Sequence, residues 1–204
     1  MRAGANVMDG AKTIIVCGNF RGGTTAVAQL LRKLDIPMGE RMDPNNNYED
    51  LEFQRLLIKD TVDKAELDRL VAHRNEKHAV WGFKFPGAHL HMPEMLQSFR
   101  NPHVIFVFRD PYAVGDSERR RTGQSLYLMM ERTVEYNLHM IRLLQSLSCP
   151  AHPVSFEQLL VRPEAVIDAL LAFLSLPLGW WGKRRLVSSV RLKKDSDSYG
   201  YTEG

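Results

Sequence analysis

Short apolar runs alternate with longer stretches of helical periodicity along most of the chain. Thr13–Cys17 and His103–Phe108 are apolar at almost every position, which is typical of strands covered on both faces of a parallel sheet. Val80–Phe85 and His152–Phe156 are two further strand candidates. This alternation predicts an α/β fold, a three-layer sandwich around a mainly parallel central sheet.

The segments between these strands carry helical signals. Ala26, Leu30 and Leu34 recur at four-residue spacing, so a helix is expected after the first strand. Asp110 and Pro111 follow the strongest strand as an N-cap candidate and a first-turn proline. The other expected helices are Tyr48–Lys59, Lys64–His73, a short helix opened by Pro93, about Gln124–Ser146, and Pro163–Leu174.

The length predicts one domain over residues 1–204, with a core at about 13–176. Beyond Gly179 the pattern fails, and residues 180–204 are expected to form a polar tail. No stretch reaches the ~20 apolar residues of a membrane span, and Met1–Gly10 lacks the apolar core of a signal peptide. Cys17 lies in an apolar run far from Cys149, which favours a buried thiol. A cytoplasmic protein without stable membrane insertion is therefore expected.

The net charge of +3 is too small to indicate nucleic-acid binding, which needs a concentrated basic stripe. It is compatible with a local basic pocket for an anionic ligand. The function must therefore be inferred from particular motifs and not from the overall charge.

A glycine-rich segment, Gly18–Thr25, joins the first strand to the first helix. Glycines let the backbone wrap around phosphate oxygens, and a helix N-terminus attracts anions. Gly18 and Gly23 keep the spacing of the G-x-x-x-x-G-K-[ST] phosphate loop, but Thr24 stands where that motif has lysine. Arg21 offers a replacement cation earlier in the loop. The segment predicts a phosphate site that is unsuited to ordinary γ-phosphoryl transfer.

A second anion site is predicted after the strand His103–Phe108. Arg109 lies at the carboxyl end of that strand, where open α/β sheets bind ligands. Ser117 follows eight residues later, and Arg121 lies four residues further on the same helical face. An arginine and a hydroxyl that converge in this way suit a phosphate monoester.

Together these two motifs resemble those of sulfotransferases. Arg21–Thr25 is similar to the Pro-Arg-Ser-Gly-Thr-Thr loop that cradles the 5′-phosphosulfate of 3′-phosphoadenosine 5′-phosphosulfate (PAPS), with Phe20 in place of the proline and Gly22 in place of the serine. Arg109 and Ser117 keep the spacing of the pair that binds the 3′-phosphate. The residues that the resemblance assigns to the cofactor are Arg21, Gly22, Gly23, Thr24, Thr25, Arg109 and Ser117.

The resemblance, to the bacterial type of this family, continues over roughly residues 13–176. Leu34–Gly39, Tyr48–Phe53, Phe83–Pro86 and Val154–Leu159 each look like a family segment, whereas the last ~25 residues show no clear Arg-Lys-Gly segment. It implies a P-loop-like enzyme that transfers a sulfuryl group from PAPS to a hydroxyl or amine, leaves adenosine 3′,5′-bisphosphate, and requires no metal.

The resemblance leaves the general base open. The cytosolic branch has a histidine where this chain has Pro86, and other branches use a glutamate after the first helix. Glu49 is the preferred candidate, and Glu40 and His89 are the alternatives. Positive charge near the transferred group would come from Arg21 and Lys84, because preorganised donors are usually the largest catalytic term.

Two other functions stay open at this point. A P-loop nucleotide or small-molecule kinase could use Asp110 for a metal, and a non-catalytic module could bind adenosine bisphosphate. The acceptor of a sulfotransferase could be a small molecule, a glycan or a lipid headgroup. Its choice is expected to depend on the loops around Asn45 and His89 and on the tail. The pattern says nothing of oligomeric state.

Overall fold

The computed structural model of the chain describes residues 10–42, 47–177 and 179–194. The chain forms two compact units, Met1–Pro153 and Val154–Gly204. Asn45 and the end of the expected tail lie outside the described residues, and the single domain over residues 1–204 stays a prediction.

A four-stranded sheet forms the centre of the fold, in the order β2-β1-β3-β4. The strands are β1 (Lys12–Gly18), β2 (Val80–Lys84), β3 (Pro102–Phe108) and β4 (Ala151–Ser155). β1 pairs in parallel with β2 and β3, and Ile15 lies opposite both Phe83 and Val104. All four strands expected from the sequence are present, and the α/β class with a parallel central sheet is confirmed.

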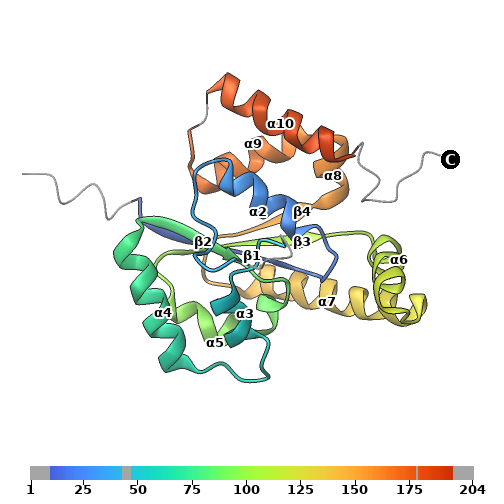
Figure 1. Cartoon of the computed structure of the whole chain (residues 1–204), viewed down its shortest axis with the longest axis horizontal. Helices are drawn as coiled ribbons and strands as arrows, with labels where there is room; N and C mark the ends of the chain where they lie inside the picture. The colour runs from blue at the N-terminus through green and yellow to red at the C-terminus, as the bar shows by residue number, and fades with distance from the viewer. Residues whose placement is uncertain (1–9, 43–46, 178, 195–204) are drawn as a thin grey trace, which may run out of the picture. The chain divides into compact units, whose positions relative to one another are not determined.

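Helices cover both faces of the sheet in the first unit (Figure 1). Helix α2 (Thr24–Arg32) lies on one face, and α3 (Leu51–Leu57), α4 (Lys64–Lys77), α5 (Met92–Met95) and α7 (Leu126–Ser146) lie on the other. Helix α6 (Pro111–Thr122) follows β3, and two short 3₁₀ helices, η1 (Pro86–His91) and η2 (Leu96–Ser98), flank α5. The layers explain why β1 and β3 are mostly apolar, since both sides of these two strands are buried, whereas β4 at the edge is only partly buried.

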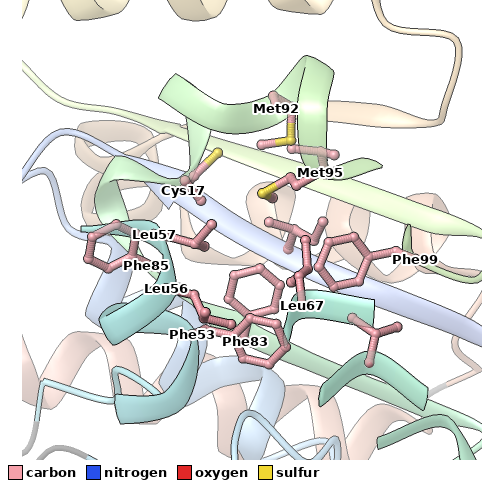
Figure 2. Packing of buried hydrophobic residues seen from close by; sticks show 14 of the residues in the cluster. Cys17, Phe53, Leu56, Leu57, Leu67, Phe83, Phe85, Met92, Met95 and Phe99 are labelled. Carbon is pink, nitrogen blue, oxygen red and sulfur yellow. The ribbon is translucent and has the colours of Figure 1, made fainter. Parts of the chain in front are cut away.

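A core cluster on the α3–α4–α7 face is rich in aromatic rings (Figure 2). Phe53 of α3 stacks on Phe83 of β2 with ring centroids 4.0 Å apart, and Phe99 packs beside Phe83 at 5.6 Å. Cys17 is a free thiol buried in this cluster, and burial raises the pKa of its thiol well above the usual value. The core therefore fixes the carboxyl ends of β1 and β2, from which the predicted site residues follow.

The expected helix over Tyr48–Lys59 was placed too early and made too long. Tyr48 has a φ of 56°, in the left-handed region that does not start a helix. Asp50 is the N-cap, and its side chain accepts a hydrogen bond of 2.9 Å from the backbone N–H of Glu52. Helix α3 runs only from Leu51 to Leu57. Tyr48 and Glu49 therefore belong to a loop.

The second unit contains three helices among its described residues, α8 (Phe156–Val161), α9 (Pro163–Leu174) and α10 (Trp180–Lys194). Helix α9 was expected, whereas α10 occupies most of the segment predicted as a polar tail. Leu186, Val187 and Val190 form the buried face of α10, a stripe too sparse among basic residues to be read from the sequence. Across the described ranges, no helix is long and apolar enough to cross a membrane.

Candidate active site

The loop between β1 and α2 is shaped by close backbone approaches. A Cβ atom at Gly18 would lie 2.5 Å from the carbonyl oxygen of Val107 in β3, so only glycine fits there. A Cβ atom at Gly22 would lie 2.6 Å from the carbonyl oxygen of Asn19. Gly23 has a φ of 87° directly before the helix. The glycines predicted to cradle phosphate are therefore required by the fold of the loop itself.

The N-terminus of α2 offers backbone donors at this loop. The nine-residue helix begins at Thr24, and no side chain caps its first N–H groups. Uncapped first-turn N–H groups, with the positive end of the helix dipole behind them, favour an anion. The loop thus has the local features that the sequence analysis assigned to a phosphate site.

Arg21 connects the loop to the second predicted anion site. Its Nε donates a hydrogen bond of 3.0 Å to Oγ of Ser117. Nη1 of Arg109 donates a hydrogen bond of 2.7 Å to the backbone carbonyl of Arg21. Arg109 and Ser117 are both buried, although each carries polar groups. The structure therefore brings together residues from two motifs that the sequence separates by about ninety positions.

A buried ion pair lies beside the loop. Nζ of Lys84, at the end of β2, donates to Oε1 of Glu49 over 2.8 Å, and both side chains are almost fully buried. The second oxygen of Glu49 accepts a hydrogen bond of 2.9 Å from the side-chain amide of Gln54. Both carboxylate oxygens of Glu49 thus have fixed partners, and this sets the orientation of the group.

Arg21, Glu49, Gln54 and Lys84 line one cavity of about 220 Å³, whereas Arg109 and Ser117 are not among its described lining residues. Three cations, Arg21, Lys84 and Arg121, and one carboxylate, Glu49, line it, so the lining residues carry a formal net charge of +2 (three minus one), and Glu118 outside the lining pairs with Arg121. Such a cavity suits a polyanion rather than a neutral ligand. The lining comprises Phe20, Arg21, Gly23, Thr24, Thr25, Asn47, Glu49, Gln54, Lys84, Pro86 and Arg121.

Glu40, the second candidate base, belongs to a different cluster. It forms ion pairs with Arg74 and with Lys77, the latter at 3.1 Å. Burial raises the pKa of its carboxyl, but hydrogen bonds from Lys77 and Arg74 outweigh that effect and hold the pKa below its usual value. Glu40 is not among the described residues that line the cavity. Its surroundings are those of a structural ion pair.

His89, the third candidate, is buried within the first unit. Its ring lies 5.2 Å from the ring of Tyr136 and 5.5 Å from that of His139, and within the described ranges neither ring nitrogen has a hydrogen-bond partner. Burial, and then the charges of His139 and His91, lower the pKa of His89 to about 3. The imidazole is therefore neutral and does not line the cavity.

Sequence reasoning gave no role to several residues that the structure places at the cavity. Gln54 lies on the first turns of α3 and had no motif to mark it. Arg121 was noted only for its helical face, yet it lines the cavity and pairs with Glu118 at 2.9 Å. Its spacing from Ser117 was the one signal that pointed to it. Among the described residues, no three His, Cys, Asp or Glu side chains gather as metal ligands would.

Comparison with known proteins identifies the class. The model of the sulfotransferase family matches residues 13–180, so the chain belongs to the sulfotransferase family. A search of curated protein sequences gives no significant match.

Solved structures show the same fold. A sulfotransferase from Mycobacterium avium superimposes with a TM-score of 0.62 at 16% identity, over 98% of this chain and 75% of that one. The sulfotransferase domain of the curacin biosynthetic pathway gives 0.59 at 18% identity, over 83% and 75%. A mouse sulfotransferase, solved as a complex with PAP, gives 0.56 at 10% identity, over 96% and 73%.

Proposed function

We propose that this protein transfers a sulfuryl group from PAPS to a hydroxyl or amine and leaves adenosine 3′,5′-bisphosphate. The observation that carries the proposal is the convergence of Arg21, Arg109 and Ser117 beside a cavity of net charge +2. Family membership supports sulfotransferase activity in general. The choice of PAPS rests on the match between the chain's two anion sites and the two phosphorylated ends of this donor.

In this scheme the loop Arg21–Thr25 and the N-terminus of α2 hold the 5′-phosphosulfate. Arg109 and Ser117 hold the 3′-phosphate, because a guanidinium and a hydroxyl on buried positions favour a phosphate monoester. Thr24 supports a donor other than ATP, since the lysine that contacts the β- and γ-phosphates of a nucleoside triphosphate is missing. The residues of the site therefore fit PAPS by charge and by donor type.

Glu49 is the proposed general base. As the acceptor oxygen attacks sulfur, its proton passes to Glu49, the new S–O bond forms, and the bond from sulfur to the bridging phosphate oxygen breaks with its electron pair on the leaving bisphosphate. Lys84 and Arg21 face the same cavity and stabilise the negative charge that develops on that oxygen. Gln54 fixes the rotation of the Glu49 carboxylate through its hydrogen bond of 2.9 Å.

The acceptor in this proposal is a small molecule, a glycan or a lipid headgroup, and the proposed location is the cytoplasm. Cys17 and Cys149 are free thiols in the structure. Reducing compartments keep thiols in this form.

Titration calorimetry with adenosine 3′,5′-bisphosphate, and in parallel with ADP and Mg²⁺, tests the donor class. Tight binding of the bisphosphate and weak binding of ADP are expected. Tighter binding of ADP with Mg²⁺ than of the bisphosphate would support a nucleotide kinase instead. Tight binding without sulfate transfer to any acceptor would favour a non-catalytic module.

Arg109→Ala sharpens the same test. It should weaken adenosine 3′,5′-bisphosphate about 10- to 100-fold, because a charge-assisted hydrogen bond to the 3′-phosphate is lost. Binding of AMP, which lacks that phosphate, should weaken much less, because AMP is affected only through the lost hydrogen bond from Arg109 to the Arg21 carbonyl. Arg119→Ala is the matched control, since Arg119 is exposed on α6 and pairs with Asp116. Equal losses for both nucleotides would contradict the role of Arg109.

A further inference from the structure

Helix α7 carries a row of exposed apolar side chains on the side away from its buried face. That buried face consists of Met129, Thr133, Met140 and Leu143. On the other side, Val134, Leu138 and Ile141 are 53%, 46% and 44% exposed. Isolated exposed apolar residues are ordinary on a protein surface, but a contiguous row of them marks an interaction site.

The spacing of this row is that of a seam between two helices. Leu138 follows Val134 by four residues, Ile141 follows Leu138 by three, and Gln145 follows Ile141 by four. Alternating steps of four and three keep side chains on one line along a helix, where they can interlock with the same line of a second helix. Helix α7 thus presents one half of a helix pair.

Two opposite charges flank this row. Glu135 and Arg142 are both exposed, and they lie on the same flank of the row because they are seven residues apart, about 10 Å along the helix axis. Across the described ranges, neither side chain takes part in an ion pair or a hydrogen bond with another residue. Both charges are therefore available to groups on a second helix.

We propose that α7 packs antiparallel against α7 of a second copy of this chain and forms a two-fold symmetric dimer. Leu138 of each copy opposes Ile141 of the other, and Val134 opposes Gln145 at the ends of the seam. In this alignment Glu135 of each copy faces Arg142 of the other. Two-fold symmetry makes each of these contacts twice, so the face is complementary to itself in shape and in charge.

The charges favour this alignment over the others that the apolar row allows. Sliding one helix by seven residues keeps the row in contact but sets Glu135 against Glu135, or Arg142 against Arg142, and like charges oppose binding. In a parallel pair the flanking positions opposite Glu135 and Arg142 are Met130 and Asn137, which carry no charge. The antiparallel alignment is the one that pairs both charges.

This inference does not depend on the proposed transfer from PAPS, because none of these residues is among those that line the cavity of net charge +2. Its test is sedimentation equilibrium of the whole protein over a wide concentration range at low salt. A single helix pair is a small interface, so we expect a monomer–dimer equilibrium with a Kd on the order of 10–100 μM. Added salt should weaken the dimer by screening the two ion pairs.

Leu138→Gln removes the centre of the seam and should weaken the dimer about 10-fold or more, since two buried leucines are lost from one small interface. Val161→Gln is the matched control, because Val161 is also an exposed aliphatic residue, 69% exposed on α8. It should leave the Kd unchanged. Circular dichroism and urea midpoints check that both variants are folded.

A charge exchange then tests the alignment. Glu135→Arg alone and Arg142→Glu alone should each weaken the dimer about 10-fold, because each sets like charges against one another at two symmetric places. The double variant should restore the affinity, since its charges pair again with their positions exchanged. Both residues are exposed, so neither single change is expected to affect folding.

Three results would overturn the proposal. A protein that stays monomeric throughout the concentration range would leave this face for a different partner. A dimer that Leu138→Gln does not weaken would use another surface. A dimer that Leu138→Gln weakens but the single charge variants do not would pair its helices in another alignment.

Discussion

Two buried cations, Arg74 and Lys84, lie in the same unit and draw their partners from the same segment, yet their surroundings differ. Arg74, on α4, is 1% exposed and pairs with Glu40, Asp50 and Glu52. Lys84, on β2, is equally buried and pairs with Glu49 at 2.8 Å. The first cluster lines no described cavity, whereas the second faces the one of net charge +2.

The difference teaches how a buried charge is recognised as functional. Arg74 ties the loop before α3 to α4, and Asp50 serves both as its partner and as the cap of α3. Lys84 pairs with the carboxylate of Glu49 and shares its cavity with two more cations, Arg21 and Arg121. A buried cation that is surrounded by carboxylates away from the described cavities is structural by default. An excess of positive charge around a cavity instead favours an anionic ligand.

The largest effect is expected on the rate of sulfuryl transfer when Glu49, the partner of Lys84, is changed. Glu49→Gln should lower the rate of sulfuryl transfer by about 10²- to 10⁴-fold, because the amide cannot accept the acceptor's proton. Single-turnover kinetics at saturating PAPS would measure it, with binding of adenosine 3′,5′-bisphosphate as the check on folding. An unchanged rate would remove Glu49 as the base.

The second largest effect is expected on the free energy of unfolding when the ion pairs of Arg74 are removed. Arg74→Met should reduce the free energy of unfolding by about 3–5 kcal/mol, because Asp50 would keep a buried charge without its partner. Urea unfolding followed by circular dichroism measures this loss. Arg55→Met is the control. Arg55 pairs with Glu66 at the exposed surface, and such pairs contribute about 1 kcal/mol or less. Similar losses for both variants would mean that the Arg74 cluster is not specially stabilising.

The third effect concerns His89, a buried titratable group that differs from both cations because it carries no charge. Its folded pKa of about 3 lies below the ordinary value of 6.5. The unfolded chain therefore gains a proton that the folded chain excludes, so stability is full above about pH 6.5 and falls as the pH drops toward 3. Each pH unit in that window costs up to about 1.4 kcal/mol.

His89→Leu should flatten this acid slope. Urea midpoints at pH 7.5 and 5.5 for the two proteins give the comparison. Lowered pKa values at His103 and His152 affect both proteins alike and cancel in the difference. Parallel pH profiles would show that His89 does not titrate as its burial requires.

The smallest effect is expected for Glu40→Gln. The Glu40 side chain is 29% exposed, so loss of its ion pairs should cost about 1 kcal/mol or less. Because its folded pKa is lowered, the carboxylate stabilises at neutral pH, and this contribution disappears as the pH falls through that pKa. Sulfuryl transfer should be unchanged. A large loss of sulfuryl transfer in Glu40→Gln, without loss of stability, would indicate that Glu40 and not Glu49 is the general base.

Sequence patterns predicted β1 and β3 well because these strands are buried along almost their whole length and are therefore mostly apolar. They also predicted an anion site with Arg21 and a second one with Arg109 and Ser117 at the same edge of the sheet, since loops at the carboxyl ends of parallel strands share an edge. Their direct contacts, such as the hydrogen bond from Arg109 to the Arg21 carbonyl, were not predictable, because backbone acceptors leave no trace in side-chain patterns.

Other features depended on packing between distant segments. The sequence could not separate Glu49 from Glu40, because the distinction lies in which cation each carboxylate reaches, Lys84 or Arg74. Helix α10 was missed because its buried stripe is short and surrounded by basic residues. Tyr48 was assigned to a helix because its left-handed φ of 56° is invisible in a pattern of residue types.

The close approach of Gly18 to Val107 has a consequence for engineering. Because a Cβ atom at Gly18 would meet the carbonyl of Val107 at 2.5 Å, the loop and the end of β3 form one interlocked part. A designer who grafts residues 18–25 alone onto another parallel sheet would leave out the surface against which the loop closes. The smallest transplantable unit must include Val107 of the neighbouring strand and Arg109 directly after it, so this anion site behaves as a two-strand module rather than a linear motif.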